Sequence, residues 1–343
     1  MRILVPGGAG YIGSHTVRTL IRHGHDVVVY DNFSTGHREF ADGIETIDGD
    51  IGDRTKLSLI LRGVDAVMHF AAYSRVGESI ANPEKYFENN LRSGLALLGA
   101  VLEAQTPYFI LSSTCAVYGV PASVPIDEDS PRAPINPYGV SKLALEQALE
   151  AYRTAYGLRY INLRYFNAAG ADESSEIGEL HQPETHLIPC ALEAAAGLRS
   201  QIEVYGLDYP TADGTCVRDY VHVSDLAEAH LLALEYLADG GQPGSINLGG
   251  GRGHSVLEVL SAVEAVTGST LNKQSCPRRP GDPPVLVADP QHALQLLDWR
   301  PQRSLLDMVS SAWNWMQSNR AKTLRELSTA KGVSEVAAIP SLG

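Results

Sequence analysis

The sequence predicts an α/β fold, with a doubly wound parallel sheet followed by a smaller C-terminal α/β lobe. Two observations carry this prediction. Over the first 170 residues, short apolar runs rich in β-branched residues alternate with helix-length segments, which is typical of βαβ units. After about residue 170 this rhythm ends, and short strand-like runs, turns and scattered prolines follow, as expected for a second lobe.

Apolar runs predict strands at Ile3–Val5, Val27–Tyr30, Val64–Phe70, Tyr108–Ser112 and Tyr160–Arg164. A helical stretch, Ser14–His23, separates the first two. Crossovers of this length join parallel strands and are right-handed in nearly all known cases. Beyond the last run, the polar and acidic Ala171–Pro183 predicts a loop, and the alanine-rich Pro189–Leu198 predicts a helix.

These elements suggest where the domains lie. We expect a first domain over residues 1–170, to which segments near 215–240 return, and a second lobe over residues 171–317. The polar, small residues of 318–343 predict a flexible C-terminal tail. A chain of 343 residues is long enough for one large domain or two moderate ones.

Composition excludes several classes of protein. Hydrophobic residues make up 44% of the chain and charged residues 20%, as in a globular protein with a sizeable core. The net charge of −13 argues against a nucleic-acid partner, because phosphate neutralisation needs clustered Lys and Arg. No apolar run approaches the roughly 18 residues of a membrane-spanning helix, so we expect no membrane partner.

Cysteine spacing bears on metal binding and location. Cys115, Cys190, Cys216 and Cys276 are far apart and form no C-x-x-C pair. This pattern predicts neither a disulfide framework nor a zinc site, and we expect no metal. The first residues lead into a predicted strand without the layout of a signal peptide. Together these observations predict a reducing, cytoplasmic location.

A glycine-rich turn follows the first predicted strand and opens the first predicted helix. Its glycines are Gly7, Gly10 and Gly13, with Tyr11 and Ile12 before the last. This spacing allows a tight turn, close approach of the backbone to a diphosphate, and close helix–strand packing. The diphosphate then lies on free N–H groups at the helix N-terminus. The turn therefore predicts a Rossmann-like, dinucleotide-binding domain.

An acidic residue at the end of the second predicted strand indicates which dinucleotide. Asp31 stands 18 residues after Gly13. A carboxylate here binds both ribose hydroxyls and repels a 2′-phosphate, which favours NAD over NADP. A further strand-like stretch ends near the expected adenine site, and the fourth run ends in small residues that let the cofactor pass close. The expected contacts are Asp31, Asn32, Asp50, Ile51, Phe70, Ala71 and Ala72.

Tyr138 and Lys142 are four residues apart and share one face of a predicted helix. A phenol, with a usual pKa near 10, is a poor base at neutral pH, but a neighbouring ammonium lowers that pKa. The pair can then take a proton from a sugar or alcohol hydroxyl, provided that a hydride acceptor lies beside it. Thr114, after the apolar run Phe109–Leu111, can hydrogen-bond the same oxygen.

The glycine turn, the strand end Ser112–Thr114 and the Tyr-x-x-x-Lys pair resemble those of the extended short-chain dehydrogenase/reductase family. The resemblance implies that Thr114, Tyr138 and Lys142 are the catalytic residues. It also implies that Lys142 and Tyr138 contact NAD, with Lys142 holding the nicotinamide ribose. Further cofactor contacts implied by the resemblance are Asn89 and Tyr165.

Within that family the chain resembles the UDP-glucose 4-epimerases from residue 1 to about residue 315. The segments that carry this resemblance are Gly7–Thr16, His69–Ala72, Val76–Ser79, Tyr165–Asn167, Asp208–Tyr220 and Arg278–Asp282. Asp208–Tyr220 discriminates best because it lies outside the shared cofactor site. The resemblance implies a homodimer, packed through helices near residues 80–105 and 138–155. It also implies interconversion of UDP-galactose and UDP-glucose through a 4-keto sugar on bound NAD.

A UDP-sugar substrate needs cations for its phosphates. Arg218 and Arg279 suit this need, since a guanidinium forks onto phosphate. The resemblance implies that Asp282 contacts a ribose hydroxyl, that Asn167 contacts a phosphate or sugar hydroxyl, and that Tyr205 contacts the uracil. The other implied substrate contacts are Thr114, His186 and Leu187.

Other substrates and reactions stay open. Leu286 occupies a sugar-pocket position that is large or small in family members, so use of UDP-N-acetylhexosamines is open. A 4-epimerase of UDP-pentoses (xylose or arabinose) shares the motifs at Ser113–Ala116 and Gly214–Tyr220. A 4,6-dehydratase is disfavoured, because it needs acidic residues where the chain has Cys115 and Ala116. A non-catalytic NAD-binding module is disfavoured by the intact catalytic trio.

Overall fold

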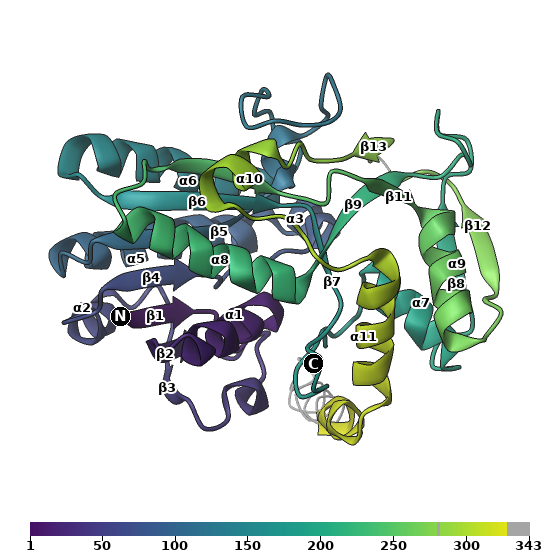
Figure 1. The fold of residues 1–343 in the computed structure, drawn as a ribbon, viewed down its shortest axis with the longest axis horizontal. Coiled ribbons are helices and arrows are strands. Elements are labelled where there is room, and N and C mark those ends of the chain that lie inside the picture. Colours follow the sequence, from purple (N-terminus) through teal and green to yellow (C-terminus); the bar gives the residue numbers. More distant parts are fainter. Residues whose placement is uncertain (280–281, 328–343) are drawn as a thin grey trace, which may run out of the picture.

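A seven-stranded, wholly parallel sheet forms the centre of the first lobe (Figure 1). The computed structural model describes residues 1–279 and 282–327. The strand order is β10-β6-β5-β4-β1-β2-β3, and β1 lies between β4 and β2, so the order reverses there. The doubly wound α/β class expected from the sequence is thus confirmed. The strands are β1 (Arg2–Pro6), β2 (Asp26–Asp31), β3 (Glu45–Asp48), β4 (Ala66–His69), β5 (Tyr108–Thr114), β6 (Arg159–Tyr165) and β10 (Gly244–Leu248).

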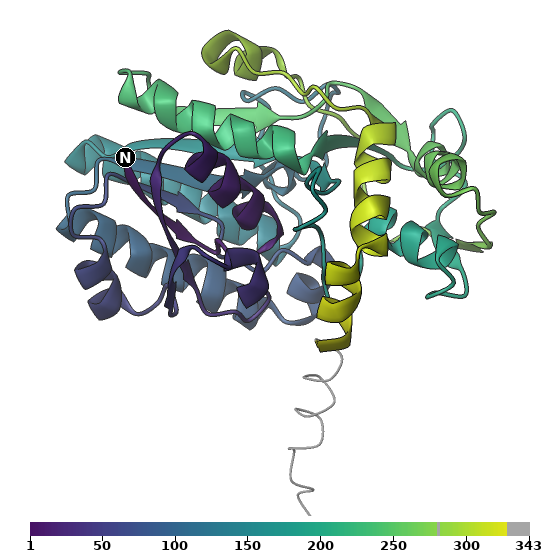
Figure 2. The same ribbon diagram turned by 60° about the horizontal axis from the view of Figure 1, so that its bottom comes forward.

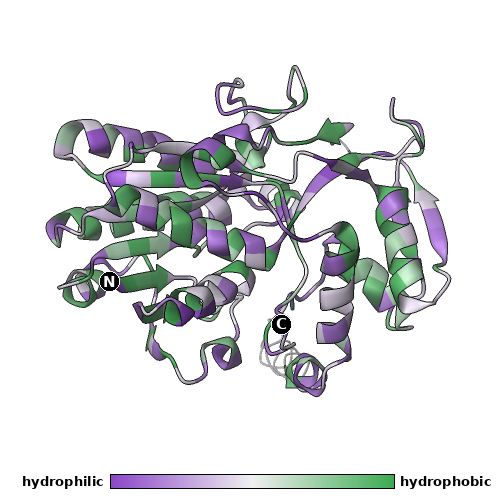
Figure 3. Cartoon of the chain, viewed as in Figure 1, coloured by the Kyte–Doolittle hydropathy of each residue, from purple (hydrophilic) through white to green (hydrophobic). Residues whose placement is uncertain are grey.

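Helices cover both faces of this sheet, as the alternating apolar runs require. Helices α1 (Tyr11–Arg22) and α8 (Val223–Ala238) pack together and share one apolar core with Ile3 and Val5 of β1. Leu4, which points to the other face, joins a second core with α2 (Arg54–Ile60), α5 (Gly94–Glu103) and α6 (Pro137–Tyr156). In Figure 3, β1 and β4 are largely hydrophobic, as expected for strands buried on both faces.

Shorter elements connect β4 to β5 and β5 to α6. Between β4 and α5 lie α3 (Val76–Ala81), α4 (Pro83–Tyr86) and the π-helical turn η2 (Phe87–Ser93). The 3₁₀ turn η1 (Arg38–Ala41) precedes β3, and η3 (Cys115–Tyr118) follows β5 directly. The turn η3 matters for the site, because it carries the chain from Thr114 toward the second lobe.

The second lobe lies beside the carboxyl ends of β5 and β6, at the right of Figure 1. It contains two small sheets and a core between its helices. Its strands are β7 (Asn167–Ala169), β8 (Ile202–Tyr205), β9 (Val217–His222), β11 (Gly253–Ser255), β12 (Lys273–Cys276) and β13 (Val285–Leu286). Its helices are α7 (Leu187–Ala195), α9 (Val256–Thr267) and α11 (Leu305–Gln317).

The chain returns to the first lobe over a longer stretch than the predicted 215–240. Strand β10 pairs with β6, Gly244 opposite Ile161, and α10 (Gln291–Leu297) packs on α8 and β10. In the opposite sense, β9 lies inside the predicted returning segment but pairs with β7, β11 and β13 of the second lobe. Pairing between distant segments decides this, and no local pattern reveals it.

The predicted C-terminal tail, 318–343, includes a helical part. Residues 319–327 are helical and follow α11 (Figure 2). Ala321 and Leu324 are buried with Phe40 and Trp315. Arg320 is paired with Asp42 at 3.1 Å. Two apolar residues in a polar stretch are a weak signal, which the sequence analysis missed. The rest of the predicted tail, 328–343, lies outside the described residues. Over the part of the chain that is described, no helix is long and apolar enough to cross a membrane.

Candidate active site

The glycine turn joins β1 to α1 and passes very close to the end of β4. Gly7 has a φ of +81°, and a Cβ there would lie 2.4 Å from the backbone nitrogen of Ala71. A Cβ at Gly13 would lie 2.2 Å from the Gly7 carbonyl oxygen. Only glycine fits both places. Helix α1 begins after Gly10 without a side-chain cap, so the first-turn N–H groups, those of Tyr11 and Ile12 among them, suit an anion.

Asp31 at the end of β2 is held in one orientation. Its carboxylate accepts hydrogen bonds from the backbone nitrogens of Ala9 (3.0 Å) and Phe33 (2.8 Å). Burial raises the pKa of Asp31, and the two N–H donors act against that rise. Next to it, the amide of Asn32 donates to the carboxylate of Asp50 at 2.9 Å. Ile51 is buried in the core beside them.

The end of β4 is tied to the glycine turn. The backbone nitrogens of Phe70 and Ala71 donate to the Pro6 carbonyl at 2.8 and 3.0 Å, and Ala72 is half-buried. The Phe70 ring lies 4.7 Å from the ring of His230 on α8, so it is also part of the core.

Asn90 is a residue that the sequence analysis missed. It is 1% exposed and exchanges two hydrogen bonds of 2.9 Å with the backbone of Tyr73. It also donates to Ser141 of α6 at 3.3 Å. The predicted cofactor contact Asn89 is only half-buried and donates to the Asn90 side chain. The two adjacent asparagines cannot be told apart without the turn that orients them.

Helix α6 brings Tyr138 to the end of β5. Asn136 caps the helix, accepting from Gly139 at 2.9 Å, and Pro137 starts its first turn. A Cβ at Gly139 would lie 2.6 Å from the Ala116 carbonyl oxygen, so glycine permits the close approach of α6 to η3. As a result, Tyr138 comes close enough to Thr114 for the threonine hydroxyl to affect its pKa.

Lys142 occupies the next turn of α6 and is buried. Its ammonium donates to the Ser112 carbonyl at 2.8 Å, and burial lowers its pKa to about 8. The Ser112 hydroxyl is hydrogen-bonded to the hydroxyl of Tyr165 at the end of β6. The ends of β5 and β6 therefore orient both members of the Tyr–Lys pair.

The predicted lowering of the Tyr138 pKa does not occur in this state. Burial is the largest effect on Tyr138 and raises its pKa, while the hydrogen bond with Thr114 acts in the opposite direction. The Lys142 ammonium is bonded to a backbone carbonyl. Phenolate formation therefore needs further positive charge, which a bound oxidised nicotinamide ring carries.

A buried polar network lies under the catalytic helix. Glu146, one turn beyond Lys142, binds Arg164 of β6 through both carboxylate oxygens, with the shortest N–O distance 2.7 Å. It also accepts from Ser113 at 2.5 Å. Arg164 donates to the hydroxyl of Tyr118 at 2.8 Å. The sequence analysis did not identify this network, although Glu146 continues the four-residue spacing of Tyr138 and Lys142.

The predicted substrate residues of the second lobe are paired with one another. Arg218 of β9 forms an ion pair with Asp282, and the Arg279 guanidinium lies 4.0 Å from the centroid of the Tyr205 ring. Leu286 of β13 lies opposite Arg218 of β9 in the parallel pairing of these two strands. Arg218 also lies close enough to Cys115, after Thr114, to lower the pKa of its thiol, although burial raises that pKa to about 12 overall. Arg218 is thus near the catalytic strand end.

The remaining predicted contacts lie on β7 and α7. Asn167 donates its amide to the Asp219 carbonyl at 2.8 Å and is half-buried. His186 is the residue before α7, Leu187 is its first residue, and the His186 imidazole is hydrogen-bonded to Glu179. The structure places Asn167 between the lobes by the pairing of β7 with β9.

Comparison with known proteins agrees with this arrangement. Residues 3–249 match the model of the NAD dependent epimerase/dehydratase family. The chain is 51% identical over 315 residues to a UDP-glucose 4-epimerase of Rhizobium meliloti, an alignment that covers 91% of this chain and 96% of that protein.

Two solved structures are also similar over nearly their whole length. One is a UDP-glucose 4-epimerase from Brucella ovis in complex with NAD (TM-score 0.89, 47% identity, 91% of this chain and 97% of that one). The other is a UDP-glucose-4-epimerase from Stenotrophomonas maltophila with bound NAD and formylated UDP-arabinopyranose (TM-score 0.91, 40% identity, 95% and 99%).

Proposed function

Because the chain belongs to the NAD-dependent epimerase/dehydratase family, we propose that it is a UDP-glucose 4-epimerase, an isomerase that interconverts UDP-galactose and UDP-glucose on bound NAD. The observation that carries this proposal is the buried Tyr138, close to Thr114, with Lys142 one turn away on the same helix. This arrangement suits removal and return of a proton at a sugar hydroxyl.

The residues of the first lobe fit NAD. Gly7, Gly10 and Gly13 leave room for a diphosphate at the start of α1, where a side chain at Gly7 or Gly13 would collide with backbone. Asp31 presents a fixed carboxylate to the ribose hydroxyls. The other proposed contacts are Tyr11, Ile12, Asn32, Asp50, Ile51, Phe70, Ala71, Ala72, Asn89, Tyr138, Lys142 and Tyr165, to which Asn90 is added.

The chain's own residues divide the work of epimerisation. When bound, NAD would supply the hydride acceptor and donor for C4 of the sugar. Tyr138 removes the proton from the 4-OH and gives it back to the 4-keto sugar after the sugar has turned over. Thr114 hydrogen-bonds the same oxygen, and Lys142 holds positive charge near the phenolate. Hydride return on the opposite face inverts C4.

The second lobe is proposed to hold the UDP end. Arg218 and Arg279 are the cations for the diphosphate, with Asn167, His186, Leu187, Tyr205 and Asp282 as further contacts. A firm hold on UDP and few charged groups at the sugar allow the keto sugar to rotate while it stays bound. To bind a phosphate, Arg218 would release its ion-pair partner Asp282 and pair with the substrate instead.

The direct test is to incubate the purified protein with UDP-galactose and measure UDP-glucose. We expect conversion without added oxidant or reductant, because the redox steps cancel. Absence of product in the presence of NAD would contradict the proposal. An inactive Tyr138→Phe protein is the matched control for contaminating epimerase.

A substrate panel separates the related activities. UDP-pentoses deserve inclusion because the similar Stenotrophomonas protein was solved with a formylated UDP-arabinopyranose. UDP-N-acetylhexosamines test the half-buried Leu286 as a limit on the sugar pocket. Comparison of kcat/KM across the panel ranks the substrates. We expect the UDP-hexoses to have the highest values.

We further propose that the protein is a cytoplasmic homodimer. Half-exposed apolar side chains on α5 and α6, Leu95 and Val140, lie on the helices expected to form the interface. The four cysteines are unpaired, which suits a reducing compartment. Light scattering of the purified protein should give twice the chain mass of 36.9 kDa, and a monomer mass would contradict the dimer.

A further inference from the structure

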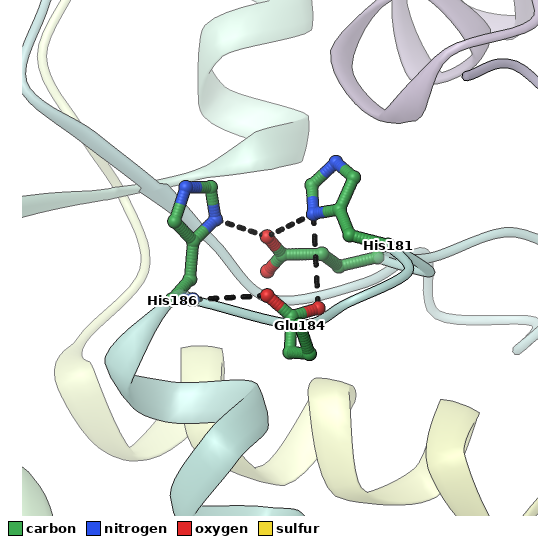
Figure 4. Close-up of side chains that lie close together, drawn as sticks. His181, Glu184 and His186 are labelled. Atoms are coloured by element: carbon green, nitrogen blue, oxygen red, sulfur yellow. Dashed lines mark hydrogen bonds and ion pairs between the residues drawn. The ribbon is translucent and has the colours of Figure 1, made fainter. Parts of the chain in front are cut away.

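Four side chains of metal-ligating types converge before α7, next to the proposed substrate contact Leu187. They are Glu179, His181, Glu184 and His186, and one ligand atom of each lies within 4.8 Å of the others (Figure 4). All come from one segment of eight residues. Cysteine spacing alone predicted no metal, and this cluster contains no cysteine.

The contacts within the cluster are short and specific. The Nδ1 atom of His181 lies 3.2 Å from Oε1 of Glu179, and Nδ1 of His186 is hydrogen-bonded to the same oxygen. The backbone nitrogens of Thr185 and His186 donate to Oε1 of Glu184 at 2.7 and 2.9 Å. These bonds turn Oε2 of Glu184 toward His181, 3.7 Å away.

The segment that carries the ligands is anchored to three other parts of the molecule. The Trp315 indole on α11 donates to the Glu179 carbonyl at 3.0 Å. The His37 ring is hydrogen-bonded to the Leu180 carbonyl at 2.9 Å, and Arg75 donates to the Gln182 carbonyl at 2.8 Å. The ligand geometry is therefore held by backbone contacts that do not involve the ligands' own side chains.

The charges of the cluster require compensation. The side chains of Glu179 and Glu184 are only 6% and 5% exposed, and two buried carboxylates need two positive charges close by. Two protonated imidazoles can supply them, and so can one divalent cation. Of the nearby arginines, Arg199 is paired with Glu193 at 3.1 Å, whereas Arg325, which lines the adjoining cavity of about 260 Å³, lies close enough to Glu184 to interact with its carboxylate.

We propose that Glu179, His181, Glu184 and His186 bind one divalent transition-metal ion of the Zn²⁺ class. Two imidazole nitrogens and two carboxylate oxygens form a four-ligand set that suits Zn²⁺, whereas Mg²⁺ and Ca²⁺ prefer oxygen ligands alone. On binding, the metal would displace any proton from the ligating imidazole nitrogens.

The position of the cluster indicates a structural role. His186 immediately precedes α7, whose first residue, Leu187, is a proposed substrate contact. The His181 ring also lies 6.4 Å from the ring of Tyr11 in the glycine turn. A metal here would fix the start of α7 relative to α1. It takes no part in the proton transfer at Tyr138.

The test is calorimetric titration of the chelator-treated, dialysed protein with ZnCl₂. We expect one site per chain with a dissociation constant below about 10 µM. In buffers of different ionisation enthalpy, the heats should reveal release of up to about two protons per zinc at neutral pH. A large excess of MgCl₂ should not compete. Absence of a stoichiometric site in the wild-type protein would overturn the proposal.

Variants locate the site. His181→Ala and His186→Ala should each weaken zinc binding by at least about 100-fold, since even loss of outer contacts costs 10- to 100-fold. The matched control is His23→Ala, which removes an exposed histidine of α1's end and should leave affinity unchanged. Retained NAD and an unchanged circular dichroism spectrum identify folded variants. Wild-type affinity in the His181→Ala/His186→Ala double variant would also overturn the proposal.

Discussion

The cofactor side of the first lobe and the substrate side of the second lobe hold their polar groups in different ways. Asp31 and Lys142 are buried and bonded to backbone atoms, so ligand binding need not reorient them. In contrast, Arg218 is paired with Asp282, and the exposed Arg279 lies over Tyr205. In the proposed complex with substrate, these side chains would exchange partners when the diphosphate binds.

This difference shows which polar side chains are already held in one orientation before a ligand binds. A hydride and a proton must move between atoms in fixed positions, which a rigid, buried constellation provides. The sugar must turn over in the site, which a more adaptable surround permits. Substitutions of the buried polar residues of the first lobe should therefore impair catalysis or folding. Substitutions of the polar residues of the second lobe should impair substrate binding.

The largest effect should come from Tyr138→Phe. Loss of the phenol removes the general base and should lower kcat by about 10²- to 10⁴-fold. NAD should stay bound, because its proposed contacts lie mainly elsewhere. The measurement is kcat with UDP-galactose, together with NAD released on denaturation. Tyr156→Phe, on the same helix but 67% exposed, is the control and should be fully active.

Glu146→Ala tests whether the catalytic helix depends on its buried ion pair. The change leaves the Arg164 guanidinium uncompensated and should lower the free energy of unfolding by about 3–5 kcal/mol. Urea unfolding measures it. Glu150→Ala, one turn further along α6, removes a carboxylate that is 54% exposed and should cost much less, about 1 kcal/mol. Equal losses of unfolding free energy in the two variants would mean that the buried Glu146–Arg164 pair does not stabilise the catalytic helix more than an exposed carboxylate does.

Lys142 should make the fold less stable at neutral pH, since burial lowers its pKa from 10.5 to about 8. Between these values the unfolded chain binds more protons than the folded one, so the unfolding free energy of the wild type rises with pH. Lys142→Met should therefore gain up to about 3 kcal/mol relative to the wild type at pH 7, less the lost Ser112 hydrogen bond.

The pH dependence is the informative part of that experiment. The advantage of Lys142→Met should shrink as the pH rises from 8 toward 10, while the activity of the variant stays low throughout. Denaturant unfolding at pH 7, 8, 9 and 10 measures the difference. A difference that does not change with pH would mean that Lys142 is not desolvated in the folded protein.

On the substrate side we expect a smaller effect. Arg279→Ala should raise KM for UDP-galactose by about 10- to 100-fold, which corresponds to one charge-assisted bond of about 1.5–3 kcal/mol. The NAD content should not change. Its neighbour Arg278, paired with Asp208 at 2.7 Å, is the matched control, and Arg278→Ala should leave KM nearly unchanged. Equal effects of both changes would point to general charge rather than a specific contact.

Much of the first lobe could be read from local patterns. The runs at Ile3–Val5 and Val27–Tyr30 became β1 and β2, because strands buried on both faces are continuously apolar and easy to recognise. The glycine turn and the Tyr–Lys spacing were likewise visible, since backbone sterics and helix geometry act over a few residues. Local patterns did not distinguish Asn89 from Asn90, or reveal that 319–327 is a helix.

What the sequence determined by itself is the chemistry available: a dinucleotide turn, a phenol with an ammonium one turn away, and two arginines in two recognisable segments. Only the tertiary structure decided how those groups are held. Burial raises the Tyr138 pKa, and Glu146 finds its partner on a distant strand. Desolvation and long-range pairing depend on which segments of the chain meet in the fold. The spacing of residues along the sequence therefore predicts neither of them.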